Sequence, residues 1–161
     1  MNKSAYRIPV KLKYGYTTRF TVLTEATSST AEKWEVTFDP QSDSPYKSIA
    51  LLSSLGNKVS GTFLTETGDY RFLDGNRSGD SLYLSCFDGS HAFLFKANLI
   101  SDSIYGDFLS GKHWKGVWNG KVNPNFELTH PDSLTYLVNE TPFTFSSTNF
   151  NGDPFVFPNK Q

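Results

Sequence analysis

The feature that most constrains this chain is a series of short runs in which apolar and polar residues alternate. The runs are rich in Thr, Phe, Tyr and Val, and Gly, Asn, Asp or Ser separates them about every 8 to 12 residues. Alternation with a period of two is typical of strands that bury one face, whereas the period of an amphipathic helix is almost absent. This spacing predicts an all-β barrel or sandwich.

Eight such runs follow one another between about Lys33 and Val122. Their marker residues are Trp34, Val36 and Phe38; Ile49 and Leu51; Val59, Gly61, Phe63 and Thr65; Tyr70 and Phe72; Leu82, Leu84 and Cys86; Phe93, Phe95, Ala97 and Leu99; Ile104, Gly106 and Phe108; and Trp114, Gly116 and Trp118. Eight strands are enough for an up-and-down sheet to close and lose its edges. We therefore predict an eight-stranded antiparallel up-and-down barrel, the meander of lipocalins and streptavidin, with a two-sheet sandwich as the alternative.

Turn-forming pairs set the expected strand ends. The fourth strand is expected to begin at Tyr70, after a turn at Gly68-Asp69, and to end near Asp74-Gly75. Asp88-Gly89 is expected to form a two-residue hairpin turn of type I′, because both residue types tolerate a positive φ.

The glycines and tryptophans inside the runs support further predictions about close backbone approaches and about the core. Gly61, Gly106 and Gly116 are expected at bends or close backbone approaches of the barrel. Trp34, Trp114 and Trp118 are all expected in the core, because Trp contributes a large apolar surface to burial.

The barrel region, 33–122, has flanks of different character. In the first flank, 1–24, the alternation within 6–13 and the short run 20–23 predict an N-terminal hairpin joined to the barrel edge, and the small polar stretch 25–32 is expected to be a linker. The segment 123–161 is expected to be irregular, with one short helical turn from His130 to Leu137. Its phenylalanines, from Phe143 to Phe157, are expected to pack on the barrel or to belong to a following domain.

Composition excludes several classes of function. The 161 residues suit one domain, and 15 basic against 16 acidic side chains argue against a dedicated nucleic-acid binder. No apolar stretch reaches the roughly 20 residues of a membrane helix, so no membrane insertion is expected. The single cysteine, Cys86, allows no internal disulfide, and its place in a strand predicts an inert, buried thiol.

No set of acid, base and nucleophile emerges from the sequence, so we expect neither an enzyme nor a cofactor in this chain. His91 and Asp88 are near enough in sequence for general-base chemistry, but Asp88 is also a turn residue and His91 precedes a strand. The His residues lack the spacing of metal ligands, and no metal site is expected.

A binding site, if the barrel has one, is expected at one of its ends. Alternate turns of a meander lie at the same end, so the turns after the third, fifth and seventh strands should converge. The candidate ligand-binding residues at this end are Thr65, Asp69, Arg71, Asp88, His91, Lys112 and His113. The alternative is that these are solvated turn residues with no common role.

Four strings resemble one known family. They are KWEVTF at 33–38, GTFLTETGDYR at 61–71, LSCFDGSHAFLF at 84–95 and SGKHW at 110–114. Together they resemble the β-rich region upstream of the thioredoxin-like domain in bacterial TlpA-like, AhpC/TSA-family redoxin proteins, over about 7–137. The stretch 143–156 resembles the segment that leads into that domain.

The resemblance implies a role without chemistry of its own. The Cys-x-x-Cys motif of the redoxin is missing, so no catalytic residue carries over. The implied role is a non-catalytic accessory module of an exported, periplasmic or lipid-anchored thiol-disulfide oxidoreductase. The thioredoxin-like domain is its implied partner, and a protein or small molecule its implied substrate. The alternative is a small-ligand-binding, lipocalin-like barrel: an open interior would favour it, whereas an interior filled by Trp34, Phe93, Phe95 and Trp118 would favour a scaffold.

Overall fold

A computed structural model describes residues 11, 14–26, 28–134 and 145–157 of the chain. The described residues divide into two compact units, one within Met1–Leu128 and the other within Thr129–Gln161. The strands of the first unit are β1 (Lys33–Phe38), β2 (Tyr46–Leu55), β3 (Lys58–Thr65), β4 (Gly68–Asp69), β5 (Leu73–Ser78), β6 (Ser81–Phe87), β7 (Ala92–Ile100), β8 (Ser103–Ser110) and β9 (Trp114–Val122).

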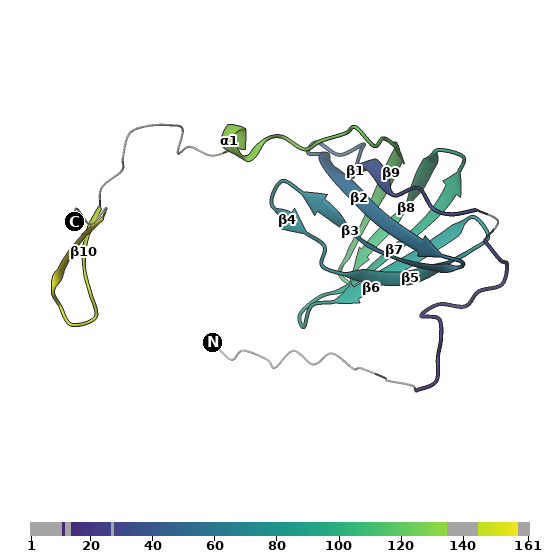
Figure 1. The fold of residues 1–161 in the computed structure, drawn as a ribbon, viewed down its shortest axis with the longest axis horizontal. Coiled ribbons are helices and arrows are strands. Elements are labelled where there is room, and N and C mark those ends of the chain that lie inside the picture. The colour runs from purple at the N-terminus through teal and green to yellow at the C-terminus, as the bar shows by residue number, and fades with distance from the viewer. Residues whose placement is uncertain (1–10, 12–13, 27, 135–144, 158–161) are drawn as a thin grey trace. The chain divides into compact units, whose positions relative to one another are not determined.

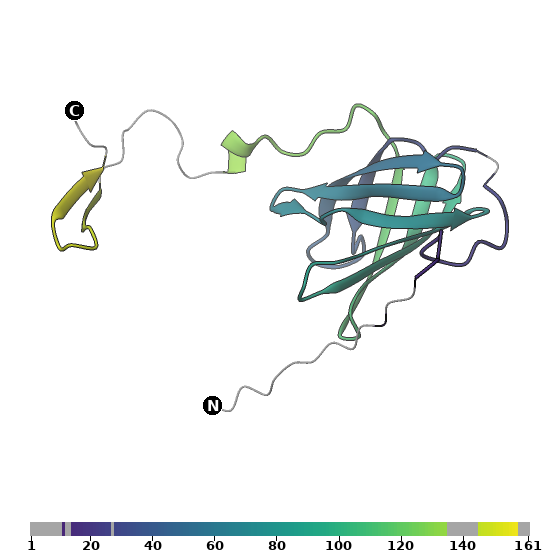
Figure 2. The ribbon, with the colours of Figure 1, turned by 60° about the horizontal axis from the view of Figure 1, so that its bottom comes forward.

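Eight of these strands close into an antiparallel up-and-down barrel (Figures 1 and 2). Neighbours along the chain pair with each other, and β1 pairs with β9 to close the ring. The short strand β4 pairs with the end of β3 and lies outside the ring. The predicted barrel between Lys33 and Val122 is therefore confirmed.

The core forms because every second residue of a strand points into the barrel. In β1 the inward residues Trp34, Val36 and Phe38 are at most 1% exposed. Trp118 of β9 is buried in the same way, but the prediction for Trp114 is wrong: it begins β9 and is 53% exposed. A first strand residue lies at the end of the barrel, where fewer neighbours cover it.

The glycines expected at close approaches lie where a side chain would collide with a neighbouring strand or, at Gly116, with a turn residue. A Cβ on Gly61 would lie 1.9 Å from the carbonyl oxygen of Leu51, and one on Gly106 would lie 1.8 Å from that of Lys96. At Gly116 the collision would be with the carboxylate of Asp39, at 2.6 Å. Only glycine lets the strands of a narrow barrel approach so closely.

The fourth barrel strand lies further along the chain than predicted. It is β5, which begins at Leu73, so Asp74-Gly75 is inside the strand and not at its end. Gly75 is there because a Cβ would lie 1.8 Å from the carbonyl oxygen of Tyr83. A glycine required by a close approach was thus mistaken for a turn glycine. Gly68-Asp69 forms β4, and the turn before it is at Glu66-Thr67.

The connection between β6 and β7 also differs from the expected type I′ turn. Four residues separate the strands, and of these only Gly89 has a positive φ, of 98°. The Asp88 carboxylate accepts hydrogen bonds from the backbone N–H groups of Ser90 and His91, at 2.8 and 2.6 Å. This side-chain capping replaces the backbone geometry of the shorter turn.

The described part of the N-terminal flank contains no strand. Residues 20–23 run without regular structure along the barrel wall, where the Phe20 N–H donates to Asn76 Oδ1 and the Leu23 N–H to Ser78 Oγ. A closed barrel has no free edge to pair with, which explains why the expected hairpin strand is absent here. The other half of the expected hairpin, within 6–13, lies mostly outside the described residues.

The second unit contains a helical turn and a hairpin. The helix α1 spans Pro131–Leu134, and Leu137, its expected end, lies outside the described residues. The segment 145–157 is not irregular, since β10 (Phe145–Thr148) pairs with β11 (Pro154–Phe157). No helix in the described ranges is long and apolar enough to cross a membrane.

Candidate functional site

The barrel has two ends with different chemistry. We call the end that carries the turns 39–45, 66–72, 88–91 and 111–113 the rim, and the opposite end, with the turns 56–57, 79–80 and 101–102, the base. Because all barrel strands pair antiparallel, the turns after the third, fifth and seventh strands lie together at the rim. The predicted binding residues are all on these turns or next to them.

The rim residues form local contacts within their own turns. Asp88 Oδ2 lies 3.1 Å from Nδ1 of His91, and Asp69 Oδ1 accepts a bond from the Arg71 N–H at 2.9 Å. The Thr65 hydroxyl donates a hydrogen bond to the Gly68 carbonyl. The His113 ring lies close to Gly111, and Lys112 is between these two residues in the sequence. Within the described chain, no hydrogen bond or ion pair joins a predicted rim residue of one turn to that of another. The rim therefore assembles the predicted residues at one end without linking them into a single cluster.

The Asp88–His91 pair contains a carboxylate whose pKa is well below its ordinary value. Bonds from the backbone N–H groups of His91 and Ser90, and then from the His91 ring, lower the pKa of Asp88 to about 2. The His91 ring stacks on Phe93, with ring centres 5.6 Å apart. The carboxylate thus stays ionised and holds the histidine at the turn, which is turn chemistry and does not itself make His91 a base.

A groove at the rim contains two of the predicted binding residues and a pair of tyrosines, of which the sequence marked only Tyr70, as a strand residue. It measures about 410 Å³ and is lined in part by Thr65, Asp69, Tyr46 and Tyr70. The hydroxyls of Tyr46 and Tyr70 lie 2.8 Å apart. Burial raises the pKa of both hydroxyls above the ordinary value of 10, at which a tyrosine is already protonated at neutral pH.

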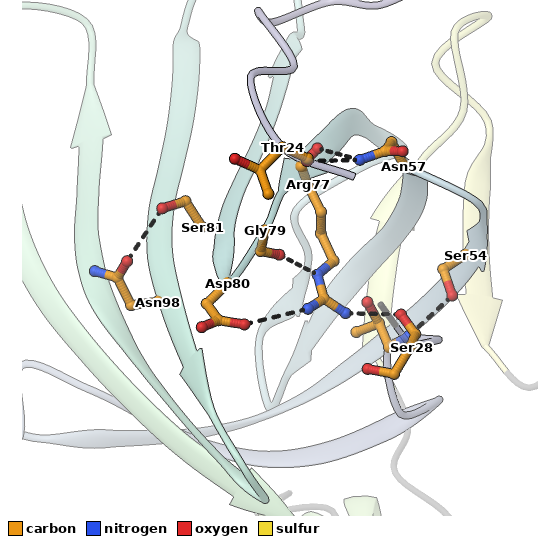
Figure 3. Close-up of polar contacts among 10 residues, drawn as sticks. Thr24, Ser28, Ser54, Asn57, Arg77, Gly79, Asp80, Ser81 and Asn98 are labelled. Carbon is orange, nitrogen blue, oxygen red and sulfur yellow. Dashed lines mark hydrogen bonds and ion pairs between the residues drawn. The ribbon is translucent and has the colours of Figure 1, made fainter. Parts of the chain in front are cut away.

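At the base, Arg77 is a buried cation that the sequence analysis missed. Its guanidinium lies between the Ser28 carbonyl and the Asp80 carboxylate (Figure 3). Nη1 donates to the Ser28 carbonyl at 3.1 Å, and Nε donates to the Gly79 carbonyl at 3.2 Å. The side chain is only 4% exposed. Alternation along the sequence predicts this position, because Leu73, Gly75 and Arg77 are at every second residue and share the inward face of β5.

The chain before β1 closes the base around this arginine (Figure 3). Thr24 accepts bonds from the Gly79 N–H and from the Asn57 side chain, and the Thr30 N–H donates to Ser54 Oγ. Thr30 is 5% exposed and Ala31 packs against the core. The stretch expected to be a linker is therefore packed against the barrel at Thr30 and Ala31.

Between the two ends, aromatic rings fill the barrel. Phe63 stacks on Phe95 at 4.6 Å between ring centres, and Phe95 stacks on Phe108 at 4.7 Å. Phe38 packs against the same group and against Trp118. The rings occupy the space in which a barrel of this size would hold a small ligand.

Cys86 lies at the rim end of β6, and it is buried as expected. Its thiol contacts the Tyr70 carbonyl, with 3.5 Å between sulfur and oxygen. Burial raises the pKa of the thiol, and the nearby Asp88 adds to the effect. The neutral thiol is a poor nucleophile.

Among the residues that the structure describes, no group of three or more His, Cys, Asp or Glu side chains is arranged to hold a metal ion. Comparison of the chain with protein-family models, with curated proteins and with solved structures found no match.

Proposed function

We propose that this chain is a non-catalytic accessory β-barrel module of a cell-envelope thiol-disulfide oxidoreductase of the AhpC/TSA family. The module recognises a substrate of the thioredoxin-like domain or braces that domain. The proposal rests on the strings at 61–71 and 84–95, which resemble the region upstream of such a domain. In this role the barrel performs no redox step, because its only thiol is Cys86.

The filled interior is the observation that supports the proposal beyond the resemblance. A barrel that binds a ligand inside needs a cavity there, whereas a scaffold needs a rigid, packed core. Phe95 and Phe63 are fully buried, and Trp34 and Trp118 are at most 2% exposed. This packing favours a scaffold over the lipocalin-like alternative, in which a small ligand occupies the interior.

The rim is the surface that we assign to the partner. Binding residues tend to lie on loops that a rigid scaffold positions, and the rim carries four such connections. Arg71 and His91 are exposed there and come from different turns. Arg71 also has a φ of 59°, a backbone conformation that non-glycine residues rarely adopt.

The reading frame that encodes the chain provides the first test. The proposal expects a Cys-x-x-Cys thioredoxin-like domain in the same polypeptide, after Gln161. A second test mixes the ¹⁵N-labelled chain with that domain. Amide shifts at 66–72 and 88–91 are expected, and Arg71→Ala and His91→Ala should each weaken the association.

The control for this titration is Lys58→Ala, at the base end of β3. It should leave the association with the redox domain unchanged. A reading frame without a redox domain would contradict the proposed family role. If both rim variants bind the redox domain as tightly as the wild type does, the surface that contacts this domain is not the rim.

A further inference from the structure

The base contains a buried cation whose charge is incompletely paired. A guanidinium has five N–H donors, and buried charged groups are usually paired and fully hydrogen-bonded. Arg77 donates to two backbone carbonyls, of Gly79 and Ser28. Its nearest carboxylate oxygen, on Asp80, is 3.9 Å from Nη2, which is beyond hydrogen-bonding distance. The Asp80 side chain is 82% exposed, so this ion pair is weak.

Arg77 is one of the residues that line a cavity of about 290 Å³. Its lining includes Arg77, Asp80, Asp102, Ser101, Trp34 and Val122. This volume is at the small end of ligand sites, which are typically about 300 to 1,000 Å³. The lining combines one cation, two carboxylates, hydroxyl groups and a small apolar surface.

The charges of this lining select the kind of ligand. A carboxylate suits Arg77 because the remaining N–H groups of the guanidinium can donate hydrogen bonds to its oxygens. Asp80 and Asp102 are both exposed, so they disfavour a purely anionic ligand only modestly, whereas the buried Arg77 disfavours a purely cationic one more strongly. A molecule that carries both a carboxylate and an ammonium group avoids both penalties.

We propose that the base cavity binds a small zwitterion of the α-amino-acid class. The ligand's carboxylate pairs with Arg77, and its ammonium group lies on the side of Asp80 and Asp102. A short apolar side chain packs toward Trp34 and Val122. The site is separate from the rim, and its lining contains none of the stacked phenylalanines of the interior, so it stands or falls independently of the proposed accessory role.

A matched set of three probes tests the proposal with the full chain. L-valine carries both charges, 3-methylbutanoate lacks the ammonium group and isobutylamine lacks the carboxylate. The reporter is the indole N–H of Trp34, which donates to the Ala31 carbonyl at 2.8 Å and borders the cavity. In ¹H–¹⁵N spectra we expect L-valine to shift this signal saturably and to bind at least about tenfold more tightly than either analogue.

The proposal is overturned if L-valine produces no saturable shift up to about 20 mM, or if 3-methylbutanoate binds as tightly. Because Arg77 is buried and its replacement can unfold the chain, the variants change the exposed carboxylates instead. Asp80→Asn and Asp102→Asn should each weaken L-valine binding about fivefold and leave 3-methylbutanoate binding unchanged or tighter. Asp43→Asn, on the rim turn between β1 and β2, is the control and should change neither. Unchanged L-valine binding in both variants would also refute the assigned orientation.

Discussion

Glu35 on β1 accepts a hydrogen bond from Lys47 on β2, with 2.9 Å between Nζ and Oε1. Its second oxygen accepts a bond from the Asn123 side chain at 3.0 Å and lies 3.5 Å from the Lys121 ammonium. The carboxylate therefore ties β1 to both of its neighbours, β2 and β9, where the barrel closes. These bonds, first that from Lys47 and then that from Asn123, lower the pKa of Glu35 to about 2 from an ordinary value of 4.5.

This depressed pKa predicts a pH-dependent contribution to stability. A carboxyl group with a lowered pKa in the folded state stabilises the fold above its unfolded pKa, and the contribution disappears as the pH falls toward the folded value. Glu35→Gln should thus reduce the free energy of unfolding by about 1 kcal/mol at pH 7. The difference from the wild type should shrink between pH 4.5 and about 2. Urea unfolding at several pH values measures it, with Glu66→Gln in an exposed turn as the control.

The close approach at Gly61 predicts a large effect of one methyl group. In Gly61→Ala the new Cβ would lie 1.9 Å from the Leu51 carbonyl oxygen, so the backbones of β2 and β3 must separate. We expect a loss of about 3 kcal/mol or more in the free energy of unfolding. Ser60→Ala, the adjacent residue on the other face of β3, should change it by less than about 0.5 kcal/mol. Equal effects of the two changes would show that the approach does not constrain the barrel.

The interior rings predict that the core tolerates no truncation. Phe95 is fully buried and lies within 4.7 Å, between ring centres, of both Phe63 and Phe108. Phe95→Ala should cost about 3 to 5 kcal/mol, since the surrounding rings cannot fill the space. Phe72→Ala, at a ring that is 70% exposed, should cost less than about 0.5 kcal/mol. Chemical denaturation measures both, and similar losses would contradict the assignment of Phe95 to a rigid core.

The barrel could be predicted from the sequence because the alternation of apolar and polar residues matches the alternation of buried and exposed side chains along a strand. The marker residues Leu82, Leu84 and Cys86 all point inward along β6, and the same rule holds for β1. Strand count and short connections then determine an up-and-down order, without any need for long-range information. The burial of Trp114 was predicted wrongly because alternation indicates which face of the sheet a residue is on, but not how far it lies from the end of the barrel.

The base was not predictable in the same way because one strand end was misplaced. Asp74-Gly75 has the composition of a turn, and only the approach of Tyr83 makes Gly75 a strand residue. Ending the strand there left Arg77 in a presumed loop, although it continues the inward face that Leu73 begins. The rim turns, in contrast, follow from the meander order alone, and their residues were placed at one end correctly.

The environment of Cys86 predicts a thiol that does not react in the folded chain. Burial raises its pKa, and the sulfur contacts the Tyr70 carbonyl at 3.5 Å, so little thiolate is present near neutral pH. A disulfide reagent such as Ellman's should modify Cys86 slowly in the folded chain and quickly in urea, since unfolding restores both access and the ordinary pKa. Cys86→Ser should leave insulin reduction by the chain at the level of the buffer, as in the wild type. Fast labelling without denaturant would contradict the buried environment, and reductase turnover that Cys86→Ser abolishes would contradict the accessory role.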